Sequence, residues 1–131
     1  MRDPPTVSEL RLEHEYHNLA NDYYRIDEYD KAIEHYTRAI NLNPSLVESY
    51  FNRSLAHTRK ENYEKAIADL SKVIELRPNS AEAYYTRGLI YEHLGQYDNS
   101  IRDYTMALEI DPMHTDAFNQ RRIAYSKKQG N

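Results

Sequence analysis

The stretch "YFNRSLA" at residues 50–56 has the spacing of an amphipathic helix, but Arg53 stands where the apolar stripe should continue. The same pattern returns in "YYTRGLI" at 84–90 and in "FNQRRIA" at 118–124. The arginines that share this place, 34 residues apart, are Arg53, Arg87 and Arg121. A charge that recurs at one interval indicates an internal repeat, which has to be settled before any other feature.

Other residues keep the same interval. The recurring tyrosines and prolines are Tyr16, Tyr50 and Tyr84, then Tyr29, Tyr63 and Tyr97, and Pro44, Pro78 and Pro112. They divide the chain into full units at 13–46, 47–80 and 81–114, with a partial unit at 115–131. Residues 1–12 are interpreted as an N-terminal tail and the start of the first helix. We expect one domain.

Each unit contains two helical patterns. In the first unit these are Tyr16, Leu19, Ala20 and Tyr23, then Ala32, Ile33, Tyr36, Ala39 and Ile40. The spacing predicts two helices, each with one apolar face. The second helix of each unit opens with an acid (Asp30, Glu64 or Asp98) and ends before a proline at Asn43, Arg77 or Asp111.

Three stretches offer helix caps. "TVSE" at 6–9 has the form of a capping box, and we expect Val7 or Leu10 to extend the first helix by a turn or two. "SLVE" at 45–48 and "NSAE" at 79–82 likewise place a capping residue three positions before a glutamate. We therefore expect Ser45 with Glu48, and Asn79 with Glu82, to cap the next two first helices.

With these patterns the chain resembles a tetratricopeptide repeat (TPR) array. The residues that match the family pattern in the first unit are Tyr16, Ala20, Tyr23, Ala32, Tyr36 and Pro44. It departs from the pattern at His57, Leu70 and Ser100. The resemblance implies an all-α fold, a right-handed superhelix of about seven helices in antiparallel pairs, with a concave groove lined by the first helix of each unit.

The recurring arginines need acidic partners, because an unpaired guanidinium between helices costs several kcal/mol. Asp69 and Asp103 recur in the second helices of the two units that carry Arg53 and Arg87. The first unit has Leu19 and His35 in these two places. We therefore expect Arg53 to pair with Asp69 and Arg87 with Asp103. In the alternative, shifted by one helix, Arg87 pairs with Asp69 and Arg121 with Asp103.

The partial unit is expected to cap the array. Small residues stand at one place in the full units (Ala20, Ser54 and Gly88), whereas the last unit has Arg122 there. Such bulk disfavours a following helix, and solenoids need a polar end. Residues 115–128 then form a solvated capping helix, and a truncated array is the alternative.

Composition excludes several classes of function. A formal charge of −4 gives no basic patch for nucleic acid, and no segment has the apolar length of a membrane span. The absence of cysteine excludes thiolate metal sites and a cysteine nucleophile, and no phosphate loop or serine elbow is present. We therefore expect a protein without catalytic activity and without a cofactor. We expect it in the cytoplasm, with the nucleus as the alternative.

His14 and His17 lie one turn apart, but their spacing misses the zinc-protease motif by one residue, so we expect no metal site.

The resemblance implies that groove residues of the first helices bind an extended peptide or a partner helix. The candidate groove residues are His17, Asn21, Phe51, Asn52, Leu55, Glu82, Tyr85, Thr86 and Leu89. Phe51, Leu55, Tyr85 and Leu89 lie off the packing stripe, so they serve either as anchors for an apolar ligand or as padding between helices. Glu48 and Glu82 belong to a mostly acidic row, which favours a ligand with some basic character.

Two alternatives stay open. Chaperone adaptors of this family hold an acidic tail with a clamp of cations and asparagines; Asn21 and Asn52 match it, while His17, Glu82 and Thr86 replace the cations. The clamp is therefore incomplete. The chain could also be a structural, self-stacking segment of a larger array, although the basic capping helix favours a monomer.

Overall fold

The computed structural model describes residues 3–130 and contains seven helices and no strand within them. The outermost residues of the expected N-terminal tail and capping segment, 1–2 and 131, lie outside the described residues. The helices are α1 (Val7–Arg25), α2 (Tyr29–Leu42), α3 (Val47–Arg59), α4 (Tyr63–Leu76), α5 (Ala81–His93), α6 (Tyr97–Ile110) and α7 (Thr115–Lys128). The all-α prediction is confirmed. None of these helices combines the length and the apolar character that crossing a bilayer requires.

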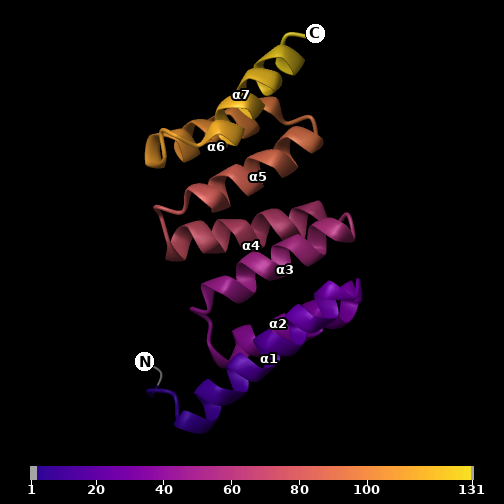
Figure 1. Cartoon of the computed structure of the whole chain (residues 1–131), viewed down its shortest axis with the longest axis vertical. Coiled ribbons are helices and arrows are strands. Elements are labelled where there is room, and N and C mark those ends of the chain that lie inside the picture. The colour runs from indigo at the N-terminus through magenta and orange to yellow at the C-terminus, as the bar shows by residue number, and fades with distance from the viewer. Residues whose placement is uncertain (1–2, 131) are drawn as a thin grey trace. The chain divides into compact units, whose positions relative to one another are not determined.

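The chain forms two compact units, Met1–Asp69 and Leu70–Asn131, and the boundary falls inside α4. In the first unit α2 packs against α1 and α3 (Figure 1). In the second unit α6 packs against α5 and α7 (Figure 1). The repeat boundaries and the single domain inferred from the sequence remain predictions beside this division.

Small residues let the paired helices approach closely. In the first unit Ala20 of α1 and Ala32 of α2 are fully buried around Tyr36, and Tyr23 and Tyr24 cover this cluster. In the second unit Gly88 of α5 lies against Tyr104 of α6, where an added Cβ would come within 2.7 Å of the ring. The recurring small residues are therefore steric requirements of helix pairing.

Each turn between a first and a second helix uses one residue in the left-handed region. These residues, 34 apart, are Asp27 (φ 62°), Glu61 (φ 61°) and Gly95 (φ 77°). After α1, the Asp27 N–H donates to the Tyr24 carbonyl at 3.0 Å, and the Glu28 N–H donates to the Tyr23 carbonyl at 2.9 Å. These two bonds make a Schellman motif, which satisfies the last carbonyls of the helix.

The second helices end as predicted. Their C-caps at Asn43 (φ −139°, ψ 93°) and Asp111 (φ −130°, ψ 90°) are extended, because the following proline disfavours helical geometry.

The caps of the first helices agree with the sequence only in part. Thr6 and Glu9 form the expected capping box, and α1 begins at Val7. The expectation for Ser45 with Glu48 is wrong, because α3 begins one residue later than this pattern requires, with Leu46 as an N-cap that lacks a side-chain bond. The expectation for Asn79 is also wrong: Ser80 caps α5, and its Oγ accepts from the Ala83 N–H at 3.2 Å.

Candidate binding surfaces on the first helices

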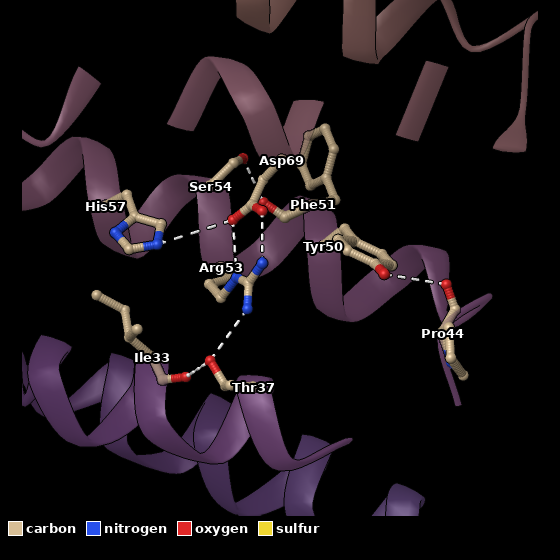
Figure 2. Close-up of polar contacts among 9 residues, drawn as sticks. All are labelled: Ile33, Thr37, Pro44, Tyr50, Phe51, Arg53, Ser54, His57 and Asp69. Carbon is tan, nitrogen blue, oxygen red and sulfur yellow. Dashed lines mark hydrogen bonds and ion pairs between the residues drawn. The ribbon is translucent and has the colours of Figure 1, made fainter. Parts of the chain in front are cut away.

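Arg53 and Asp69 form a two-bond ion pair between α3 and α4 (Figure 2). Arg53 Nε donates to Asp69 Oδ2 at 2.8 Å, and Nη2 donates to Oδ1 at 2.7 Å. Arg53 Nη1 donates to Thr37 Oγ1 at 3.0 Å (Figure 2). The carboxylate raises the pKa of Arg53, and the guanidinium also lies 5.7 Å from the centre of the Tyr50 ring. This arginine is thus part of the scaffold.

Arg87 repeats the arrangement within the second unit. Its Nε and Nη2 each donate to Asp103 at 2.8 Å, and its Nη1 donates to Ser71 Oγ at 3.0 Å. Of the two pairings expected from sequence, the structure has the first. The shifted pairing is wrong, because Asp103 holds Arg87 while Arg121 Nη1 donates to Thr105 Oγ1 at 3.2 Å.

His57 adjoins the first of these pairs. Its Nε2 lies 3.8 Å from Asp69 Oδ2 (Figure 2), and its side chain is 9% exposed. Burial lowers the pKa of His57, which the Asp69 carboxylate opposes only in part. The imidazole therefore packs mainly as a neutral ring in the place of the family's tyrosine.

A hollow of about 240 Å³ opens beside Asn21 and Asn52, within the compact unit Met1–Asp69. Asn21 Oδ1 accepts a bond from the Tyr36 hydroxyl and another, at 3.0 Å, from Asn52 Nδ2. Burial raises the pKa of Tyr36 to about 12, so its hydroxyl stays a donor. The residues that line the hollow are Asn21, Tyr24, Arg25, Tyr36, Asn52 and Leu55. Two oriented amides at the wall of an open hollow suit the recognition of polar groups.

His17 lies close to this network. Its Nδ1 is 2.6 Å from Ser49 Oγ, and its ring centre is 5.6 Å from that of Tyr36. Burial lowers the pKa of His17; the Glu48 charge opposes this shift and His14 adds to it. His17 therefore gives this surface a hydrogen-bonding ring rather than the permanent cation of a clamp.

The structure brings together four of the five candidates in the first unit. Leu55 lines the hollow with Asn21 and Asn52, and His17 joins them through Tyr36. Phe51 is half-buried, and its carbonyl accepts a bond from Ser54 Oγ at 2.5 Å (Figure 2). Tyr36 also lines the hollow, although its place in the apolar stripe of the second helix had not predicted a role on this surface.

In the second unit, Tyr85 is the centre of a ring cluster. Its ring centre lies 4.8 Å from that of His114 and 5.9 Å from that of Tyr104. Glu82 is exposed, and its Oε2 lies 3.9 Å from His114 Nε2. Burial raises the pKa of Tyr85, and the negative charges of Asp116 and Glu82 raise it further. This surface is therefore aromatic and negatively polarised.

Thr86 and Leu89, the other two candidates of this unit, are half-buried on α5.

Glu92 of α5 forms a buried polar site whose partners were not predicted from the sequence. Its side chain is 7% exposed. Glu92 Oε1 accepts from the Tyr104 hydroxyl at 2.7 Å, and Oε2 accepts from Lys127 Nζ at 2.8 Å. A third donor, Gln120 Nε2, lies 3.4 Å from Oε1. No local sequence pattern predicts the hydrogen bonds of Glu92, because their donors come from three places far apart in sequence.

Comparison with known proteins places these features in one family. The family model described as "Tetratricopeptide repeat" matches residues 56–125, and a second, described as "TPR repeat", matches residues 20–60. Serine/threonine-protein phosphatase 5 of Rattus norvegicus and of Homo sapiens are each 44% identical over 54 residues, which are 41% of this chain and 11% of the phosphatase. The chain thus spans about a tenth of the length of these curated relatives.

Solved structures agree over nearly the whole chain. The first TPR of Spaghetti (RPAP3), bound to the HSP90 peptide SRMEEVD, has a TM-score of 0.84 at 25% identity and covers 92% of this chain and 95% of that one. The TPR domain of Arabidopsis OM64 has a TM-score of 0.81 at 25% identity, over 88% and 96% of the two chains. MamA has a TM-score of 0.85 at 27% identity, over 89% and 68%.

Proposed function

The chain belongs to the tetratricopeptide repeat family, and we propose that it is a protein-interaction scaffold that binds an extended peptide or a partner helix. The binding residues are the groove candidates of α1, α3 and α5. The similar RPAP3 structure is bound to a peptide, and we propose the same kind of ligand for this chain. The fold is an interaction module, and no catalytic role is proposed for it.

The observation that carries the proposal is the amide pair beside the hollow on α1 and α3. Asn21 is held by two hydrogen bonds to one oxygen, so its amide is oriented before any ligand arrives. Leu55 supplies an apolar wall to the same hollow. Fixed polar groups beside apolar surface let a peptide bond its backbone and bury a side chain without an entropic cost in the scaffold.

The chemistry of the surface favours a ligand with apolar anchors and some basic residues. His17, Glu82 and Thr86 stand where a carboxylate clamp needs cations. Glu82 and Asp116 add negative charge around Tyr85, which repels an acidic tail. Phe51, Leu55, Tyr85 and Leu89 are the proposed anchors.

The direct test is a peptide-array screen of the chain, followed by titration of the best peptide by fluorescence anisotropy. We expect binding that weakens at least tenfold in a Phe51→Ala, Tyr85→Ala double variant. We also expect weaker binding at high salt and in Glu82→Lys, because the ligand is partly basic. Arg102→Gln, an exposed charge change on α6, serves as the control. Binding that responds neither to salt nor to Glu82→Lys would show that the electrostatic part is wrong.

A chaperone adaptor is the second candidate, supported by the retained Asn21 and Asn52 and by the HSP90 peptide in the RPAP3 structure. Titration with SRMEEVD decides between the two. Micromolar affinity that is lost in Asn52→Ala would favour the adaptor, whereas affinity weaker than that of the array peptide favours the first proposal.

Self-association of the scaffold is a third outcome. Sedimentation without any ligand tests it, and we expect a monomer.

A further inference from the structure

α7 carries part of an interface that is complete on α3 and α5. Arg53 and Arg87 each hold a hydroxyl with Nη1 and an aspartate with Nε and Nη2. Arg121 makes the hydroxyl bond, to Thr105 at 3.2 Å. Among residues 3–130, however, no carboxylate pairs with Arg121. Nε and Nη2, which bind an aspartate in Arg53 and Arg87, thus have no acidic partner in Arg121.

The same side of α7 exposes apolar surface where the other first helices are covered. Phe118 and Tyr125 are 49% and 46% exposed, whereas Tyr50 and His57, at the corresponding places of α3, are 8% and 7% exposed. A shallow hollow of about 640 Å³ adjoins this side and shares Arg122 and Tyr125 with it, but it lies toward Asn119, Ile123, Ser126 and Lys127. Between α5 and α6 this side is where Gly88 meets Tyr104. The side of α7 that carries Arg121 thus exposes apolar side chains whose counterparts on α3 are buried.

We propose that this face binds an amphipathic, acidic helix of a partner protein, whose aspartate pairs with Arg121. The chain itself gives the pattern that fits such a face. In "AIADL" (66–70) and "SIRDY" (100–104), a small residue lies three positions before the aspartate and a large apolar residue follows it. The docked helix carries the same order of small residue, aspartate and apolar residue.

Because Arg122 is bulky, the partner helix needs a smaller side chain opposite it than the chain's own second helices have. Ala20, Ser54 and Gly88 hold this place elsewhere, and at Gly88 even a Cβ would approach Tyr104 within 2.7 Å. A tyrosine therefore cannot pack over Arg122. The partner helix needs a less bulky side chain there, and a second carboxylate that pairs with Arg122 strengthens the complex.

A second copy of the chain does not meet these requirements. Its Asp69 and Asp103 are 5% and 3% exposed and already paired with Arg53 and Arg87. Two α7 faces placed together would bring Arg121 and Arg122 of one copy against those of the other, which is repulsive. Charge complementarity thus selects an acidic helix from another protein.

The test uses the whole chain, labelled with ¹⁵N, and a synthetic peptide based on residues 63–77 in which Lys65 and Lys72 are replaced by glutamate, YEEAIADLSEVIELR, so that the helix is acidic. We expect the Arg121 Nε–H and the Phe118 amide signals to shift on titration. A matched peptide with asparagine in place of the aspartate should bind at least tenfold more weakly, because it cannot form the ion pair. Arg121→Gln and Phe118→Ala chains should lose affinity to a similar degree. Arg102→Gln, an exposed arginine of α6, should bind as the unchanged chain does.

Three results would overturn the proposal. They are no shift of α7 signals at millimolar peptide, equal binding of the two peptides, and shifts confined to Arg53 and Arg87, which would indicate exchange with an internal helix. Concentration-dependent association of the free chain that Phe118→Ala abolishes would assign the face to a second copy. Thermal unfolding of each variant verifies that it is folded.

Discussion

Tyr36 and Tyr104 hold the same place in the first and third repeats, yet the two units give them different partners. The Tyr36 hydroxyl donates to Asn21, a neutral amide that also accepts from Asn52. The Tyr104 hydroxyl donates to Glu92, a buried carboxylate that also holds Lys127. The repeat therefore decides where a tyrosine packs, whereas single residues outside the repeat pattern decide the electrostatics around it.

The arginine pairs are the part that both units share. Arg53 with Asp69 and Arg87 with Asp103 have the same two bonds and nearly the same lengths, 2.7 to 2.8 Å. A framework common to the units thus supports surfaces of different charge, and four changes test this separation.

The largest effect is expected from removing the shared aspartates. Asp69→Ala and Asp103→Ala should each lower the free energy of unfolding by about 3 kcal/mol, because a mostly buried guanidinium loses its partner. Urea denaturation measures both, and Asp30→Ala, at a 79% exposed side chain, is the control. Costs that differ widely between the two variants would contradict a common framework.

Gly88→Ala sharpens the comparison at the small residues. The new Cβ would meet the Tyr104 ring at 2.7 and 2.9 Å, so we expect a loss of about 1–3 kcal/mol in thermal unfolding. Ser54→Ala, at the same place in the first unit, already has its Cβ and should cost less. A Gly88→Ala chain as stable as the parent would mean that the ring moves aside freely.

A pH titration distinguishes the units through His57, since Tyr91 holds its place in the second unit. Burial lowers the pKa of His57 below 6.5, so the unfolded chain binds more protons than the folded chain as the pH falls below that value. Its contribution to stability is present above pH 6.5 and is lost as the pH falls through the folded-state pKa. Denaturation at several pH values should therefore give a shallower decline for His57→Gln, and an unchanged slope would contradict the assignment.

The smallest effect concerns the left-handed turns. Glu61→Gly should raise the free energy of unfolding by about 0.5 kcal/mol, since glycine accepts φ 61° without strain. Gly95→Ala should lower it by about 1 kcal/mol. Differential scanning calorimetry measures both variants, and a loss of stability in Glu61→Gly together with a gain in Gly95→Ala would refute the turn assignment.

The sequence predicted the helices and the arginine pairs well because both depend on a repeat. A pattern that returns every 34 residues gives several observations of each weak local signal. The two places that hold Arg53 and Asp69 in the second repeat hold Leu19 and His35 in the first, and this joint change pointed to a contact. Each pair, Arg53 with Asp69 and Arg87 with Asp103, lies within one repeat, where the pairing of two adjacent helices determines the geometry.

Features without such repetition were less predictable. The caps expected at Ser45 and Asn79 failed by one residue, because a helix start depends on backbone geometry that spacing alone does not fix. The partners of Glu92 were not predicted, because Tyr104, Gln120 and Lys127 meet it only after α5, α6 and α7 have packed.

The bond from Lys127 to Glu92 fastens the last turn of α7 to α5 across 35 residues of sequence. Helices held by few contacts open locally before the rest of a fold, and this ion pair is one of the contacts that hold α7. Acetylation of Lys127 would remove its charge and this tether, so the backbone amides of α7 would exchange with deuterium sooner than those of α5. Modification of a single amine would then release α7 from α5.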